Sequence, residues 1–292
     1  MSQVDSVGVL GAGLMGAGIA QVAAVAGYRT VCRDVSQDAL AKAQASIAKS
    51  LARFVEKGNL NAADRDAALR HLTFTDDLDA VAHTSLVIEA VTEDLAVKNT
   101  LFTDLNVRSP HRTVFASNTS SLTIGAMAVA SNRPDRFVGL HFFNPVPLMP
   151  LVEVVRGVTT SESTMSAAME FVQRLGKVPI EARDTSGFIV NLLLVPYLLD
   201  AVRALERGAG TVTDIDRGMK LGCGYPMGPF TLLDFVGLDT TMRIGEIMFE
   251  EYRETRYAPP PLLKRMVLAG WLGRKSGRGF YDYSQDPPRA MG

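Results

Sequence analysis

The sequence is poor in cysteine and tryptophan, and its charges almost cancel. Its two cysteines, Cys32 and Cys223, lie far apart and have no metal-type spacing, which argues against a disulfide framework and a cysteine-based metal site. We therefore expect reduced thiols in an intracellular, cytoplasmic protein without a bound metal. The sequence also has no Lys or Arg before Arg29, so the basic start typical of a secretory signal is missing.

The charge and hydropathy patterns argue against two further classes of partner. Lys and Arg total 30 against 31 Asp and Glu, a formal net charge of −1, so no basic field for nucleic acid is expected. The most apolar late run, 187–199, is interrupted by Asn191 and Pro196 and is too short to span a membrane. With 47% apolar residues, 292 residues suffice for about two domains with separate cores.

The amino-terminal region carries the pattern of a dinucleotide-binding turn. A short apolar strand at 6–10 is followed by Gly-x-Gly-x-x-Gly, a helical run and a second strand. The turn contains Gly11, Gly13, Leu14, Met15 and Gly16. Its first glycine allows a tight turn, its second lets a diphosphate approach the backbone, and its third lets the helix lie close to the sheet. The N–H groups at the helix start then face the diphosphate.

An acid ends the second strand where a fold of this kind contacts the adenosine ribose. Asp34 lies 18 residues past Gly16, close to the usual offset of about 20. Its carboxylate can accept both ribose hydroxyls and would repel a 2′-phosphate, which favours NAD over NADP. Arg33 leaves an alternative open, because a guanidinium beside that position could accept a 2′-phosphate.

Alternating β-rich and helical segments over residues 1–185 predict a doubly wound, mostly parallel α/β sheet of the Rossmann type. Strands are expected at 6–10, 30–32, 85–90, 113–116, 137–141, 151–155 and 177–180. An Ala- and Lys-rich stretch at 36–72, broken at 57–59, predicts an inserted helical hairpin. The hairpin could be a solvated appendage or an arm for a large substrate, and the residues alone slightly favour the appendage.

After residue 185 no further convincing strand follows, so 186–283 is predicted to be an all-α domain. Helices are expected at 187–206, 212–221, 228–250 and 261–269. An apolar helical unit of this size often buries a face against a second copy of itself, so we expect a homodimer through this domain. The polar, proline-rich residues 284–292 are expected to be a frayed tail.

Polar residues at three strand ends carry the candidate chemistry, because ligands bind outside the carboxyl ends of the strands in open α/β sheets. Ser120 follows one strand and His141 ends another. Glu153 stands alone in an apolar run, where a buried carboxylate needs a partner, and His141 is the obvious candidate. A His–Glu pair suits a general base. The alternative is an exposed edge strand with an outward-facing glutamate.

Asn191 is the polar residue of an apolar helix in the second domain. An asparagine among Ile, Val and Leu is unfavourable in a helix unless its side chain has a target. That target could be another helix or a ligand in a cleft between the domains.

These motifs together resemble the L-3-hydroxyacyl-CoA dehydrogenases, especially the stand-alone 3-hydroxybutyryl-CoA type, over roughly residues 4–283. The matching segments are 11–16, 116–122, 141–147, 151–155, 184–191, 224–229 and 277–282. One departure is Leu192, which stands where many relatives have arginine.

The resemblance implies an NAD-dependent interconversion of (3S)-3-hydroxyacyl-CoA and 3-ketoacyl-CoA, with short chains expected. It implies that His141 is the general acid and base, that Glu153 orients it, that Ser120 binds the reacting oxygen near the nicotinamide, and that Asn191 engages the acyl-CoA carbonyl region. The implied cofactor contacts are Asp34, Glu93, Lys98, Ser120 and Asn144, and the implied CoA contacts are Ser50 and Lys57 on the hairpin.

Two alternatives remain at this point. A related dehydrogenase of a free sugar acid or hydroxy acid, such as gulonate, would use a similar architecture; Lys57 and the aromatic residues 142–143 argue against it. A non-catalytic NAD-binding protein is the alternative from another class, and the intact set of Ser120, His141, Glu153 and Asn191 argues against that.

Overall fold

The structure is a computed structural model that describes residues 4–291. By their internal contacts these residues form two units, divided between Phe188 and Ile189, three residues after the predicted boundary. The last residue of the predicted tail, Gly292, lies outside the described residues.

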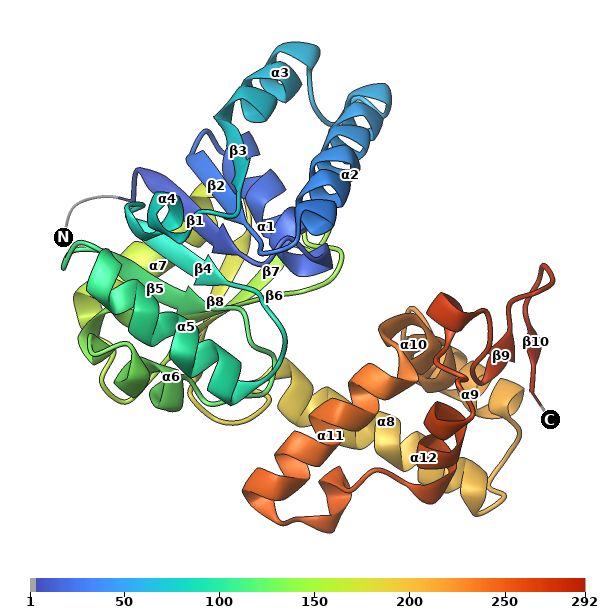
Figure 1. Cartoon of the computed structure of the whole chain (residues 1–292). Coiled ribbons are helices and arrows are strands. Elements are labelled where there is room, and N and C mark those ends of the chain that lie inside the picture. Colours follow the sequence, from blue (N-terminus) through green and yellow to red (C-terminus); the bar gives the residue numbers. More distant parts are fainter. Residues whose placement is uncertain (1–3, 292) are drawn as a thin grey trace. The chain divides into compact units, whose positions relative to one another are not determined.

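The first unit is an eight-stranded sheet in the order β3-β2-β1-β4-β5-β6-β7-β8 (Figure 1). Its strands are β1 Ser6–Leu10, β2 Arg29–Arg33, β3 Leu72–Thr75, β4 Leu86–Glu89, β5 Val114–Ser117, β6 Phe137–Phe142, β7 Leu151–Arg156 and β8 Val178–Arg183. All neighbouring pairs are parallel except β6 and β7. The order turns back between β1 and β4, which defines the ligand crevice of a doubly wound sheet. The predicted fold class is confirmed.

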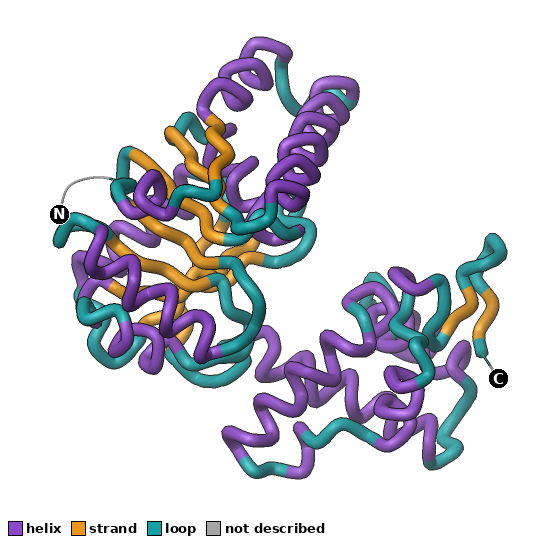
Figure 2. Tube along the Cα trace, in the orientation of Figure 1, coloured by secondary structure: helices purple, strands orange, loops and turns teal. Residues whose placement is uncertain are grey.

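Helices cover both faces of this sheet (Figure 2). They are α1 Leu14–Val25, α2 Gln37–Glu56, α3 Ala62–His71, α4 Leu78–Ala82, α5 Leu95–Arg108, α6 Ile124–Ala130 and α7 Glu162–Arg174. Successive strand residues alternate between two cores, as the period of a strand requires. Val138 and Leu140 of β6 belong to the core beneath α1 and α7, whereas Phe137 belongs to the core beneath α5 and α6.

The inserted hairpin is present as α2 and α3, which extend away from the sheet at its β3 edge (Figure 1). Asn61 caps α3 by accepting a hydrogen bond from the Asp64 N–H group. The hairpin ends at His71 and runs directly into β3, an edge strand that the sequence pattern did not reveal. With the sequence Leu-Thr-Phe-Thr and no fully buried residue, β3 is too short for a clear alternation.

The second unit is mainly helical, and its expected boundaries need three corrections. It contains α8 Val190–Glu206, α9 Val212–Cys223, α10 Pro229–Val236, α11 Leu238–Tyr252 and α12 Pro261–Leu268, with strands β9 Tyr281–Asp282 and β10 Arg289–Ala290. The helix expected at 228–250 is broken at Gly237, whose φ of 104° suits glycine. The first helix starts at Val190 rather than 187. Within the tail expected to fray, Arg289 and Ala290 pair as β10 with β9.

Candidate active site

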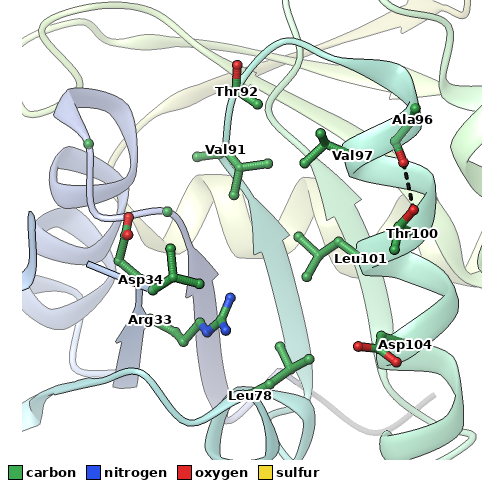
Figure 3. Close-up of a pocket in the computed structure, with 14 residues that line it drawn as sticks. Arg33, Asp34, Leu78, Val91, Thr92, Ala96, Val97, Thr100, Leu101 and Asp104 are labelled. Carbon is green, nitrogen blue, oxygen red and sulfur yellow. Dashed lines mark hydrogen bonds between the residues drawn. The ribbon is translucent and has the colours of Figure 1, made fainter. Parts of the chain in front are cut away.

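A cavity of about 770 Å³ opens where the sheet order turns back, at the carboxyl ends of β1, β2 and β4. Figure 3 shows Arg33 and Asp34 on one side of it and Val97, Leu101 and Asp104 of α5 on the other. Most of its wall is apolar, which suits a flat ring system, and polar residues stand on both sides, with Arg33 and Asp34 at the end of β2 and Thr100 and Asp104 on α5. This is the place and the character expected of an adenosine site.

The glycine turn after β1 has the geometry predicted for a dinucleotide fold. Gly11 has a φ of +95°, and a Cβ there would meet the Ala90 carbonyl oxygen at 2.6 Å. A Cβ on Gly16 would lie 1.8 Å from the Gly11 oxygen, so the helix could not approach the turn. Above Gly13, by contrast, no atom lies within 4 Å of an added Cβ. The open side of the turn is therefore available to a diphosphate at the start of α1.

Asp34 is fixed by the turn that it faces. Its Oδ2 atom accepts from the Ala12 N–H group at 2.8 Å, and Oδ1 accepts from the Ser36 N–H group at 2.9 Å. A carboxylate has about four lone-pair sites, so Asp34 retains acceptors for two ribose hydroxyls. Arg33 donates through Nε to the Asp76 carbonyl at 3.0 Å, which holds its guanidinium along the cavity wall (Figure 3).

The predicted contact between His141 and Glu153 is present. These residues lie directly opposite each other in the antiparallel pair β6–β7, so their side chains share one face of the sheet. His141 Nδ1 lies 2.6 Å from Glu153 Oε2, and the two side chains are 7% and 0% exposed. The edge-strand alternative is wrong, because β7 lies between β6 and β8. Donation from Nδ1 to the carboxylate leaves Nε2 as the ring's acceptor.

Aromatic side chains confine the imidazole. The Phe143 ring centroid lies 4.5 Å from that of His141, and the Phe188 centroid lies 5.6 Å away. Phe188 is buried and has a positive φ of 51°, an uncommon conformation for a bulky residue that marks the end of the first unit. Packing and the Glu153 contact together leave the ring little freedom to rotate.

Ser120 lies in the loop after β5, and Glu93 holds that loop. One Glu93 oxygen accepts from the Ser120 N–H group at 3.1 Å and from the hydroxyls of Thr119 and Ser121. The other oxygen lies 3.2 Å from Lys98 Nζ. Burial alone would raise the pKa of Glu93, but the Lys98 ammonium and these hydrogen bonds outweigh it and hold the pKa below its ordinary value.

Lys98 is almost fully buried, and neither of its two ion pairs was predicted. Its Nζ atom lies 2.5 Å from Glu89 Oε1 as well as near Glu93. Glu89 is fully buried at the end of β4, where burial raises its pKa against the opposing effect of Lys98 and of donors from Ser117 and Val91. The signal was available, because an acid in an apolar strand is the same anomaly that identified Glu153.

Two further side chains fix the end of β6 and the loop that follows it, and they also escaped prediction. Asn118 Oδ1 accepts from the Phe142 N–H group at 2.9 Å, which joins the loop of Ser120 to the strand of His141. Lys177 donates to the carbonyls of Val146 and Met149 at 2.6 and 2.7 Å, and burial lowers its pKa. No sequence signal pointed to Lys177, since its partners are backbone atoms of a remote loop.

The remaining predicted residues lie on other elements. Asn191 belongs to the second unit, in the first turn of α8. Ser50 and Lys57 lie two helical turns apart on α2, half-buried and exposed respectively. Asn144 is exposed in the loop after β6. The first unit thus brings the dinucleotide turn, Ser120, His141 and Glu153 to one edge of one sheet.

Two other features are absent from residues 4–291. Within this range no group of three or more His, Cys, Asp or Glu side chains could hold a metal ion. The described helices include none that is both long and apolar enough to cross a membrane.

Comparison with known proteins agrees with the architecture of both units. The family model described as "3-hydroxyacyl-CoA dehydrogenase, NAD binding domain" matches residues 6–185, and "3-hydroxyacyl-CoA dehydrogenase, C-terminal domain" matches residues 187–283. The 3-hydroxybutyryl-CoA dehydrogenase of Mycobacterium tuberculosis is 50% identical over 282 residues, which cover 96% of this chain and 99% of that protein.

A human relative and a solved bacterial structure show the same similarity over nearly the whole chain. The human mitochondrial hydroxyacyl-coenzyme A dehydrogenase is 49% identical over 96% of this chain and 91% of its own length. The crystal structure of (S)-3-hydroxybutyryl-CoA dehydrogenase PaaH1 from Ralstonia eutropha has a TM-score of 0.92 and 42% identity, and covers 97% of this chain and 100% of that chain. The chain therefore belongs to the 3-hydroxyacyl-CoA dehydrogenase family, whose NAD-binding domain forms its first unit.

Proposed function

We propose that this protein is a short-chain (3S)-3-hydroxyacyl-CoA dehydrogenase in which His141 and Glu153 form the catalytic pair. The observation that carries the proposal is their buried contact of 2.6 Å, on the sheet that also holds the dinucleotide turn. When bound, NAD accepts a hydride from C3 of the substrate, and NADH returns it to the 3-keto group. The hydroxyl proton has to be transferred at the same time, and a side chain of the protein accepts or donates it.

His141 takes this proton on Nε2 in the oxidative direction and gives it to the developing alkoxide in the reductive direction. Glu153 accepts from Nδ1, which fixes the tautomer and compensates the positive charge that the ring gains with the proton. Ser120 hydrogen-bonds the reacting oxygen, and Asn191 of the second unit engages the acyl-CoA carbonyl region. In the oxidative direction the alcohol loses one hydride and one proton, and in the reductive direction the ketone gains both.

NAD is held by the residues whose geometry fits it. The open side of the Gly11–Gly16 turn takes the diphosphate and Asp34 takes the adenosine ribose, with Leu14 and Met15 in the first turn of α1. Glu93, Lys98 and Asn144 are proposed to line the nicotinamide half.

The substrate is proposed to be a CoA thioester, because the hairpin carries Lys57, whose ammonium group can bind a phosphate of CoA. Lys57 caps the exposed carboxyl end of α2 and can meet a CoA phosphate as a point charge, with Ser50 two turns before it. With a CoA substrate, the hairpin is interpreted as an arm that contacts a large substrate rather than as a solvated appendage.

We also propose a homodimer formed through the second unit. Its surface exposes Leu193, Leu221 and Leu268, with Leu221 and Leu268 at 79% and 87%. Isolated apolar side chains are ordinary, but a helical unit with several of them suits burial against a second copy. Sedimentation of the purified protein measures the oligomeric state.

The free thiols of Cys32 and Cys223 support a reducing compartment, and we propose the cytoplasm.

The test is oxidation of NADH in the presence of acetoacetyl-CoA, followed by absorbance. His141→Ala should lower kcat by about 10²–10⁴-fold, the usual contribution of a general acid or base. The exposed His83, which bonds the Asp79 carbonyl, provides the matched control, and His83→Ala should retain wild-type turnover. Acetoacetate as the free acid should be a poor substrate. Faster turnover of free acids than of thioesters would support the sugar-acid alternative instead.

A further inference from the structure

Three charged side chains meet at the carboxyl end of β4. Lys98 Nζ lies 2.5 Å from Glu89 Oε1 and 3.2 Å from Glu93 Oε2. The Glu89 and Lys98 side chains are 0% and 1% exposed, and Glu93 is 27% exposed. Among residues 4–291, Lys98 is the one cation in ion-pair contact with either acid. When all three are ionised, the cluster therefore carries one excess negative charge.

Burial raises the pKa of Glu89, but the hydrogen bonds around it favour its ionised form. Oε1 accepts from the Val91 N–H group at 2.7 Å and from Lys98, and Oε2 accepts from the Ser117 hydroxyl at 2.6 Å. Both oxygens thus act as acceptors, which is the role of a carboxylate. A buried ammonium also needs a counter-charge close by, and Glu89 is the nearer of its two partners.

The cluster lies on the path of a bound dinucleotide. Asp34 at the end of β2 and the open turn at Gly13 after β1 fix where the adenosine half and the diphosphate lie. The nicotinamide half then extends in the other direction, past the ends of β4 and β5 toward His141 on β6. Glu93 reaches the same region, since it binds the Ser120 N–H group.

We infer that the Glu89–Lys98–Glu93 cluster raises the affinity of the site for the oxidised, positively charged nicotinamide relative to the neutral reduced ring, and that Glu89 supplies the excess negative charge. Glu89 is a positioning and electrostatic residue in this scheme, because it acts through Lys98 and the field of the cluster. The inference rests on the proposed function, since it assumes that the site binds NAD with the nicotinamide on this side.

The test exploits an isosteric change. In Glu89→Gln, the amide oxygen can keep the bonds to Val91 and Lys98, while the amide nitrogen can donate to the Ser117 oxygen. The variant loses a charge but retains its shape. We expect the ratio of the dissociation constants of NAD⁺ and NADH to rise roughly five- to tenfold, the order expected for one charge at intermediate dielectric.

Both constants are measured by calorimetry or by NADH fluorescence on the full-length protein, without substrate. Ser117→Ala is the matched control, because it removes a hydrogen bond to Glu89 but no charge, so it should leave the ratio unchanged. If Glu89→Gln does not fold, Glu93→Gln removes the same unit of charge and should move the ratio in the same direction.

An unchanged ratio in a folded Glu89→Gln protein, or an equal weakening of both cofactors, would overturn the inference. Failure of the proposed function is a separate result. A wild type that binds both cofactors but does not turn over acetoacetyl-CoA would refute the proposed function, whereas the shift of the ratio in Glu89→Gln would still support the charge inference.

Discussion

Replacing Glu153 by glutamine tests the proposed catalytic pair while keeping the volume of a fully buried side chain. The change removes a charge-assisted hydrogen bond of 2.6 Å to His141. Such a bond contributes about 1.5–3 kcal/mol, which corresponds to a factor of roughly 10–150 in rate when it strengthens in the transition state. If the new amide nitrogen donates to Nδ1, the ring proton moves to Nε2 and the loss should be larger, up to about 10⁴-fold.

The assay is steady-state kinetics with acetoacetyl-CoA and NADH across the pH range. We expect kcat to fall at least tenfold, with KM for NADH little changed because Glu153 lies on β7, away from the glycine turn. Glu162→Gln is the control, since Glu162 is an exposed acid that pairs with Arg156 on the surface. A Glu153→Gln enzyme within threefold of wild-type kcat at every pH would refute the reasoning.

Three further predictions concern the cofactor, the hairpin and acid stability. Wild type should have a higher kcat/KM for NADH than for NADPH, and Asp34→Ser should reduce the difference between the two values. A preference of wild type for NADPH would mean that Arg33 rather than Asp34 determines the cofactor specificity. Lys57→Ala should raise KM for acetoacetyl-CoA about tenfold, and it should not raise KM for acetoacetyl-pantetheine, which lacks the nucleotide phosphates; equal effects on both would contradict a phosphate contact. Because the pKa of Glu93 is lowered in the folded state, its stabilising contribution is present above the ordinary pKa and is lost as pH falls through the lowered value. The free energy of unfolding, measured with urea between about pH 6 and 3, should therefore fall less steeply in Glu93→Gln than in wild type.

The sequence predicted the parts of the fold that depend on strong local patterns. The glycine turn, the positions of most strands and the hairpin follow from residue types at fixed spacings, and Glu153 drew attention because it is an acid among Val and Leu. The edge strand β3 and the break at Gly237 were missed because four half-buried residues give no clear period, and because one glycine in an apolar helix does not by itself mark a boundary.

The glycine turn, Asp34, Ser120 and His141 were predictable from spacing and strand ends, whereas other site residues could be found only where a residue contradicted its surroundings. Glu89 carried such a signal, but Asn118 and Lys177 did not, because they act on backbone groups that approach them only in the folded chain. The contact between His141 and Glu153 depends on the register of β6 and β7, in which the two residues lie opposite each other. The hydrophobic pattern limits the possible registers but does not determine which one forms.

The central claim is that a hydride passes between a nicotinamide and C3 of a CoA thioester beside His141. It is tested most directly with NADH deuterated at C4 and acetoacetyl-CoA, with analysis of the product by mass spectrometry and chiral chromatography. We expect (3S)-3-hydroxybutyryl-CoA that carries deuterium at C3, and a loss of this product in His141→Ala. A product without deuterium at C3, or a His141→Ala enzyme that forms it at the wild-type rate, would contradict the account.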